Sequence, residues 1–142
     1  MLKRLGEMGS FRKFTISEET PLLTGLIIFA HGSRIETANQ GVRAIAAQLA
    51  QATAVEHVVP AFLELGQPDL AGAAASLAKL GVSRIVIIPY FLTLGLHLER
   101  DLPQLVAGLK LAHPGIDIQV TPPLEGHPGL LNVLLDRWKQ AT

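Results

Sequence analysis

The segment Leu26-Ile27-Ile28-Phe29-Ala30-His31-Gly32-Ser33-Arg34 joins five apolar residues to a polar turn that begins with a histidine. A second segment has the same arrangement: Ile85-Val86-Ile87-Ile88-Pro89 leads through a short apolar stretch and Gly95 to His97. Short apolar runs bounded by Gly or Pro are typical of parallel strands buried on both faces. Because ligands bind outside the carboxyl ends of such strands, the two segments predict two imidazoles at one site.

The rest of the chain alternates between strand and helix patterns. Strands are predicted over 25–30, 55–62, 84–90 and 116–120. Helices are predicted over 37–52 and 128–140, from Pro68-Asp69 to Gly81, and from an N-cap at Asp101 through Leu109. In the last helix, the apolar spacing predicts four buried side chains, Leu131, Leu134, Leu135 and Trp138.

This order predicts an α/β fold, a three-layer αβα arrangement around a four-stranded parallel sheet. The first and third strands are uniformly apolar and suit the centre of the sheet. The second strand contains Pro60 and the fourth alternates apolar with polar residues, so both suit the edges. The strand order 2-1-3-4, with flavodoxin-like winding, satisfies these preferences. Its switch point lies between the strands that precede His31 and His97.

Composition excludes several classes of protein. The chain has 142 residues, of which 49% are hydrophobic, and this suits one globular domain. Twelve basic and twelve acidic residues balance, so charge predicts neither a nucleic-acid nor a membrane partner. No apolar run approaches the roughly 18 residues that span a bilayer. Cysteine is absent, which excludes disulfides and thiolate sites and is compatible with a cytoplasmic location.

The first 24 residues differ from the rest in carrying scattered charges and few apolar residues. We expect residues 1–24 to form a flexible N-terminal extension. The functional domain is then expected to comprise residues 25–142.

Three residues are the candidates for chemistry. His31 and His97 follow the two central strands, and Glu64 follows the second strand in Ala61-Phe62-Leu63-Glu64. Two imidazoles and a carboxylate suit a borderline divalent metal, and they equally suit acid–base catalysis. The spacing matches no zinc-finger or HExxH pattern, so the residues alone leave this choice open.

Other residues around these three are candidates for ligand binding. Ser33, Arg34 and Arg100 can hold anionic groups. The apolar Tyr90-Phe91-Leu92 can form a wall for a flat ligand or pack into a subunit contact. His127 follows the fourth strand and is a further candidate for the same rim.

Several known motifs are absent. The chain has no GxSxG elbow, no GxxxxGK[ST] loop and no GxGxxG fingerprint. A phosphoryl hydrolase with His31 as its nucleophile is an alternative, but such a site would need an arginine where Ala30 stands.

The motifs occur in a specific order. Phe29-Ala30-His31-Gly32-Ser33-Arg34 and Ala61-Phe62-Leu63-Glu64 come first. Pro89-Tyr90-Phe91-Leu92 follows, with Gly95, His97 and Asp101-Leu102-Pro103, and then Pro123-Leu124 with Gly126 and Pro128. From about Gly25 to Trp138, the chain resembles the small single-domain sirohydrochlorin cobaltochelatase and ferrochelatase family of class II chelatases.

The resemblance implies a function. It implies ATP-independent insertion of Co²⁺, Fe²⁺ or Ni²⁺ into sirohydrochlorin, in cobalamin or siroheme biosynthesis, by a cytoplasmic homodimer. The metal is a substrate, and no permanently bound cofactor is expected. The family's two histidines correspond to His31 and His97, which would hold the metal, and its glutamate corresponds to Glu64. A non-catalytic tetrapyrrole or metal carrier that uses the same pocket is the alternative.

Overall fold

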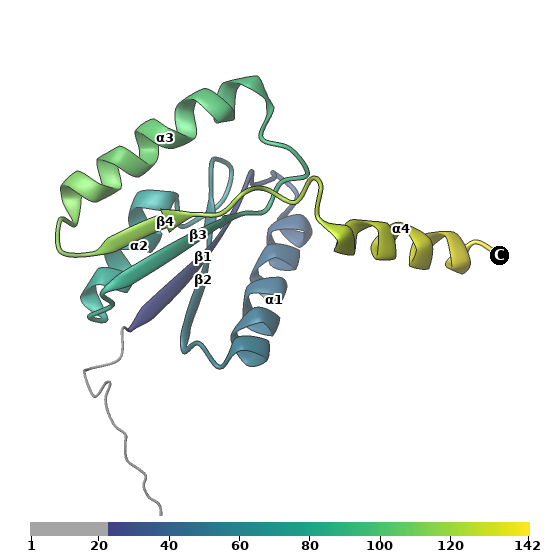
Figure 1. Cartoon of the computed structure of the whole chain (residues 1–142), viewed down its shortest axis with the longest axis horizontal. Coiled ribbons are helices and arrows are strands. Elements are labelled where there is room, and N and C mark those ends of the chain that lie inside the picture. Colours follow the sequence, from purple (N-terminus) through teal and green to yellow (C-terminus); the bar gives the residue numbers. More distant parts are fainter. Residues whose placement is uncertain (1–22) are drawn as a thin grey trace, which may run out of the picture.

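The computed structural model describes residues 23–142, in which four strands alternate with four helices (Figure 1). The strands are β1 (Thr24–Ala30), β2 (His57–Phe62), β3 (Arg84–Pro89) and β4 (Asp117–Val120). The helices are α1 (Glu36–Thr53), α2 (Leu70–Lys79), α3 (Gly95–Ala112) and α4 (Pro128–Gln140). The predicted element order is confirmed; β2 begins two residues later than predicted, so Glu56 precedes it.

The four strands form one parallel sheet in the order β2-β1-β3-β4, as predicted. Ala30 at the end of β1 is level with Phe62 in β2, and Phe29 is level with Pro89 in β3. The carboxyl ends of β1, β2 and β3 therefore meet at the same edge of the sheet. This edge carries the segments that begin at His31, Leu63 and Tyr90.

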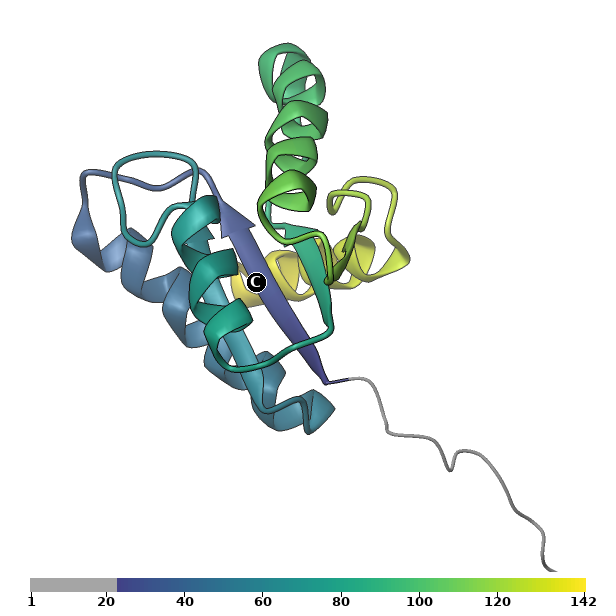
Figure 2. The same ribbon diagram turned by 90° about the vertical axis from the view of Figure 1, so that its left-hand side faces the viewer.

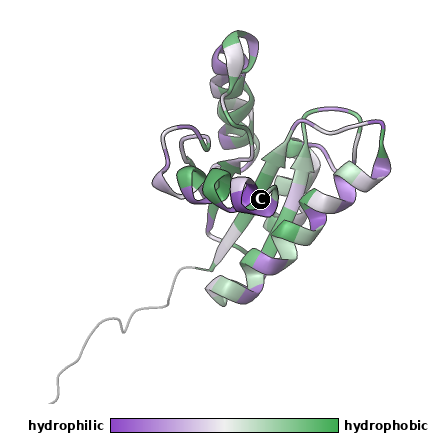
Figure 3. Cartoon of the chain, turned by 90° about the vertical axis from the view of Figure 1, so that its right-hand side faces the viewer, coloured by the Kyte–Doolittle hydropathy of each residue, from purple (hydrophilic) through white to green (hydrophobic). Residues whose placement is uncertain are grey.

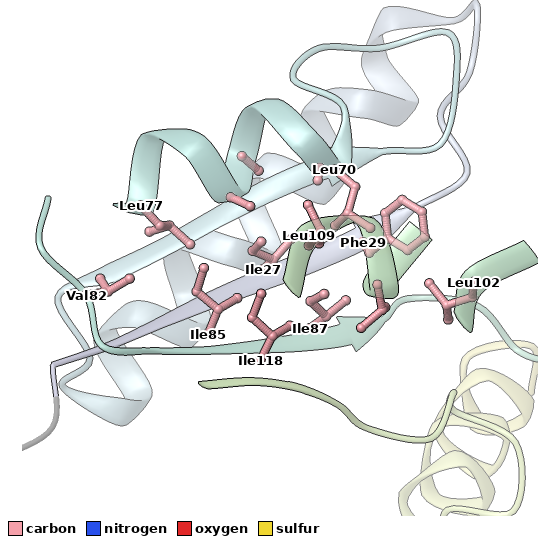
Figure 4. Packing of buried hydrophobic residues seen from close by; sticks show 14 of the residues in the cluster. Ile27, Phe29, Leu70, Leu77, Val82, Ile85, Ile87, Leu102, Leu109 and Ile118 are labelled. Carbon is pink, nitrogen blue, oxygen red and sulfur yellow. The ribbon is translucent and has the colours of Figure 1, made fainter. Parts of the chain in front are cut away.

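Helices cover the two faces of the sheet unequally. In both ribbon views α1 and α3 lie on opposite sides of the sheet (Figures 1 and 2). The larger core joins β1 and β3 to α2 and α3, with Ile27, Phe29, Ile85 and Ile87 pointing toward these helices (Figure 4). The smaller core lies under α1, where Val42 and Ala46 pack on Ile28 and Phe62.

Local signals set the ends of α2. The Asp69 carboxylate accepts a hydrogen bond from the Gly72 backbone N–H at 2.8 Å, which satisfies a free donor in the first helical turn. Gly81, which follows the C-cap residue Leu80, has φ +86°, the left-handed conformation that commonly ends a helix. The predicted start at Pro68-Asp69 and stop at Gly81 are confirmed.

The start of α3 differs from the prediction. The helix begins at Gly95, so Asp101 lies within it and is not its N-cap, and His97 stands in the first turn rather than in a loop. Pro103 is the ninth residue of the helix, and because proline has no backbone N–H, one helical hydrogen bond is missing there. Buried apolar residues lie on both sides of the proline, and their packing stabilises the helix in spite of it: Leu98, Leu102, Val106 and Leu109.

The prediction for α4 was right about the helix and wrong about its burial. The helix projects away from the sheet (Figure 1), and none of its residues is buried. Its four apolar stripe residues, predicted to be in the core, are 44–67% exposed: Leu131, Leu134, Leu135 and Trp138. The pattern identified the apolar face correctly, but a pattern does not specify which molecule covers that face.

Two further observations concern the described residues. The predicted flexible extension at residues 1–24 lies almost entirely outside them, since the description begins at Leu23. Within residues 23–142, no helix is both long enough and apolar enough to cross a membrane.

Candidate active site

Hydrogen bonds that continue past the strand ends place His31 beside Glu64. The parallel β1–β2 ladder extends through Leu63 N–H to Ala30 O at 2.9 Å and Glu64 N–H to His31 O at 3.0 Å. The two backbones therefore stay paired beyond the regular sheet. As a result, the His31 Nε2 and Glu64 Oε2 atoms lie 3.3 Å apart.

Gly32 permits this close approach. Its φ is +92°, a conformation that L side chains rarely adopt, and a Cβ atom there would lie 1.7 Å from the Glu64 carbonyl oxygen. Only glycine can occupy the position without moving one of the two segments. The glycine in His31-Gly32-Ser33 is therefore required by the geometry of the His31–Glu64 pair.

The hydrogen bonding of His31 leaves one nitrogen free to act. Its Nδ1 atom lies 3.1 Å from the Gly32 carbonyl oxygen, which can only accept, so Nδ1 carries the hydrogen. In the neutral ring, Nε2 then presents a lone pair toward a carboxylate oxygen of Glu64. Two facing acceptors are stabilised by a proton or a metal cation between them. A backbone carbonyl on the second ring nitrogen is also the usual support of a metal-binding histidine.

Asn39 in α1 holds the two loops of this site together. It is only 2% exposed, and its Oδ1 atom accepts from Ser33 N–H at 2.9 Å. Its Nδ2 donates to the carbonyl oxygens of Ser33 at 2.9 Å and Leu65 at 3.0 Å. The sequence did not identify Asn39 as a site residue. A polar residue in a helix pattern is normally expected to be exposed, and the backbone groups that Asn39 binds come near it only in the tertiary structure.

His97 faces the same hollow as His31, as predicted. The rim pocket, with a volume of about 290 Å³, lies at the carboxyl edge between β1 and the start of α3. Its walls are mostly apolar, and Phe91 is fixed in them by an edge-to-face contact with Phe29 at 5.8 Å. The rim pocket is lined by His31, Leu63, Phe91, Leu94, Gly95, Leu96, His97, Leu98 and Asp101.

Asp101 is a second residue that sequence reasoning missed as a site residue. Because α3 begins seven residues earlier than expected, Asp101 lies one helical turn past His97 and lines the rim pocket with it. Its carboxylate pairs with the Arg100 guanidinium, Nε to Oδ1, at 3.1 Å. The spacing of four residues would have placed His97 and Asp101 on the same face of a helix, but only if both had been predicted to lie within that helix.

The remaining candidates are distributed around the edge. Tyr90 lines a groove beside α1 rather than the rim pocket, and Leu92 is exposed, so of the predicted apolar wall only Phe91 faces the histidines. Ser33 Oγ accepts from Ile35 N–H at 3.0 Å, and Arg34 is exposed directly after it. His127 caps α4, since its Nδ1 accepts from Gly129 N–H at 2.8 Å.

The metal-binding groups are not gathered into a finished cluster. Among residues 23–142, no three His, Asp or Glu side chains lie close enough together to hold a metal ion. His31 and Glu64 form a pair, and His97 and Asp101 stand elsewhere in the wall of the same pocket. A separate hollow between α3 and β4, about 370 Å³, has no histidine in its lining.

Comparison with known proteins identifies similar sequences. A model of the CbiX family matches residues 25–141. The chloroplastic sirohydrochlorin ferrochelatase of Arabidopsis thaliana is 34% identical over 113 residues, 80% of this chain and 50% of that protein. A sirohydrochlorin cobaltochelatase of Methanopyrus kandleri is 33% identical over 84 residues, 59% of each chain. The matched part of this chain thus spans about half to three fifths of the length of these curated relatives.

Solved structures share the fold. A CbiX protein from Marinobacter aquaeolei VT8 superimposes with a TM-score of 0.73 at 26% identity, over 83% of this chain and 96% of that one. SirB from Bacillus subtilis, solved with Fe³⁺, gives a TM-score of 0.70 at 25% identity, over 87% of this chain and 48% of that one.

Proposed function

This chain belongs to the CbiX family, and from that premise we propose that it inserts Co²⁺ or Fe²⁺ into sirohydrochlorin without ATP. The observation that carries the proposal is the His31–Glu64 pair, 3.3 Å apart, at the edge of an apolar pocket that His97 also lines. The named relatives that act on sirohydrochlorin include both a cobaltochelatase and a ferrochelatase.

The chemistry requires a base and a weak metal site. A free-base tetrapyrrole loses two N–H protons as a divalent metal enters, so the ring gains M²⁺ and releases two H⁺. Neutral His31, with its Nε2 lone pair exposed, can hold the metal or accept one proton. Glu64 is the second acceptor, and its negative charge favours a metal cation next to His31.

The other residues bind the macrocycle and the metal from further positions. We assign His97 to the second metal contact and Phe91 to the apolar wall that faces the ring. Ser33, Arg34 and Arg100 stand around the rim, where they can hold the ring's carboxylates. Tyr90 and Leu92 have no place in this assignment, since the rim pocket does not include them.

The same proposal includes the assembly and the location. We take residues 25–142 as the chelatase domain, since the family match covers 25–141. The domain acts as a homodimer in the cytoplasm, which suits a chain without cysteine. The metal is consumed as a substrate and is not retained.

The test is metal insertion followed by the absorbance change of sirohydrochlorin with Co²⁺ or Fe²⁺. We expect insertion faster than in the protein-free control, and a loss of about 100-fold or more in His31→Ala. His57→Ala is the matched control, because His57 lies at the opposite end of β2 and pairs with Glu56 at 4.0 Å. Tight sirohydrochlorin binding without acceleration at any pH would contradict the proposal and identify a carrier.

A further inference from the structure

Asp101 is a carboxylate in the rim pocket to which the proposed function gives no role. It lines the pocket together with His31 and His97, and its side chain is 50% exposed. The other carboxylate of the site, Glu64, pairs with His31 at the ends of β1 and β2. The site therefore has one imidazole and one carboxylate from the strand ends, and a second imidazole and carboxylate from α3.

The packing of α3 fixes the positions of His97 and Asp101. Leu98 and Leu102, each one residue further along the helix, are buried in the larger core at 6% and 4% exposure. The two polar residues are spaced four apart and so share the adjacent side of the helix. Figure 3 shows hydrophilic as well as hydrophobic residues along α3. The buried leucines thus hold Asp101 at the pocket on a regular helix rather than on a loop.

The charge of Asp101 decides which part of the proposed substrate it can face. Sirohydrochlorin carries carboxylates around its periphery, and contact between like charges is unfavourable. The centre of the free-base ring instead presents N–H groups, from which a carboxylate can accept. The Arg100 guanidinium contacts Oδ1 of Asp101 at 3.1 Å, and a carboxylate has a second oxygen with which to accept a proton. Asp101 therefore suits the ring centre and not the ring edge.

The number of protons released calls for a second carboxylate. Insertion of one divalent metal releases two ring protons, and an imidazole nitrogen that binds the metal has no lone pair left for either of them. With His31 and His97 on the metal, as assigned above, Glu64 accepts one proton and the other requires a further acceptor. Among the described residues that line the rim pocket, Asp101 is the only carboxylate.

We propose that Asp101 is a catalytic residue of the metal-insertion reaction and accepts the second ring proton. The N–H bond breaks, its electron pair stays on the nitrogen that binds the metal, and the proton moves to Asp101 and then to water. The half-exposed side chain gives this proton a route to solvent. This inference rests on the proposed function and extends it to a residue of α3.

Asp101→Asn tests this role with the least change of shape. Because the amide cannot take up a proton as a carboxylate does, we expect kcat for Co²⁺ insertion into sirohydrochlorin to fall about 100-fold, with both KM values nearly unchanged. Glu99→Gln is the matched control and should keep the wild-type kcat, because Glu99 is on the same helix but lines the separate hollow between α3 and β4. A wild-type kcat in Asp101→Asn would show that one acceptor serves both protons, and would overturn the proposal.

Chemical rescue separates proton transfer from a structural role. Asp101→Ala leaves space where the carboxylate stood, so added formate should raise its kcat at least about tenfold, in proportion to the formate concentration. Formate should not change the rate of Glu99→Ala, which controls for its effect on the metal. Urea denaturation shows that both variants are folded. A folded Asp101→Ala that is inactive and that formate does not rescue would contradict proton transfer to this position.

The kinetic constants distinguish two other roles of Asp101. A raised KM for Co²⁺ at unchanged kcat would make it a metal ligand. A raised KM for sirohydrochlorin, reproduced by Arg100→Met, would mean that Asp101 orients the guanidinium toward a ring carboxylate. Either result overturns this inference and leaves the metal-insertion proposal intact, whereas a wild-type chain that does not accelerate insertion overturns both.

Discussion

At the scale of single residues, the site depends on two side chains that face each other across the ends of β1 and β2. His31 and Glu64 are 56% and 58% exposed, so neither contributes to the core. In the proposed function this pair binds the metal and accepts protons, and a solvent-exposed pair of this kind contributes little to folding stability.

Glu64→Gln should therefore slow metal insertion and leave folding unchanged. The amide keeps the size of the side chain but removes the charge that favours a cation beside His31. We expect insertion about 10–100-fold slower, measured by sirohydrochlorin absorbance, with an unchanged urea midpoint. Glu56→Gln is the control, because Glu56 stands beside His57 at the opposite end of the sheet. An equally small effect of both substitutions would refute the role of Glu64.

Asn39→Ala should affect both stability and rate. Its removal leaves part-buried backbone groups of Ser33 and Leu65 without their hydrogen bonds to Asn39, at a cost of about 1 kcal/mol or more. The two loops then lose their link, so metal insertion should slow as well. Urea denaturation and the absorbance assay measure the two effects. Gln40→Ala is the matched neighbour, since Gln40 is exposed and makes one contact of 3.4 Å to Glu36.

At the scale of elements, the decisive feature is the turn that follows β1. His31 lies directly after β1, at the carboxyl edge of the sheet, and there the backbone is hydrogen-bonded to the segment that follows β2. Gly32 makes that approach possible, whereas Gly41 in α1 has no atom within 4 Å of the position of an added Cβ. The same substitution should thus have opposite effects at the two glycines.

Gly32→Ala should destabilise the protein by more than about 1 kcal/mol, because the backbone is left-handed and the Cβ would overlap the Glu64 carbonyl. Gly41→Ala should stabilise it by about 0.5–1 kcal/mol, because alanine favours the helix. Urea denaturation measures both free energies of unfolding. Similar values for the two variants would show that the close approach at Gly32 does not constrain the fold.

At the scale of the whole molecule, one layer of the fold is left incomplete within a chain. Helices α2 and α3 cover one face of the sheet, and α1 covers only part of the other (Figures 1 and 2). Cover of the exposed apolar face of α4 by the second copy of the proposed homodimer would make the stability of α4 depend on protein concentration.

Hydrogen exchange should reveal this dependence. We expect amides of α4 to exchange slowly in concentrated protein and quickly on dilution, since the undocked helix is marginal. Amides of β1 and β3 should stay protected at both concentrations and serve as the internal control. Protection of α4 that is independent of concentration would contradict docking between copies.

Much of the fold could be predicted from sequence because its signals are local. The apolar runs at 26–30 and 85–88 identify the central strands, and Asp69 and Gly81 mark the ends of α2. The edge positions of β2 and β4 follow from Pro60 and from the alternation in β4. Predicted strand quality was therefore enough to obtain the correct order β2-β1-β3-β4.

The sequence by itself determined the sheet, its order, and the arrival of His31, Glu64 and His97 at one edge, since strand burial and chain direction follow from patterns along the chain. Only the tertiary structure decided that Asn39 links the two loops, that Asp101 joins the pocket, and that Tyr90 lies outside it. It also decided that α4 leaves its own sheet. The physical reason is that periodicity identifies which face of an element is apolar, whereas contact between distant segments depends on where the whole chain places that face.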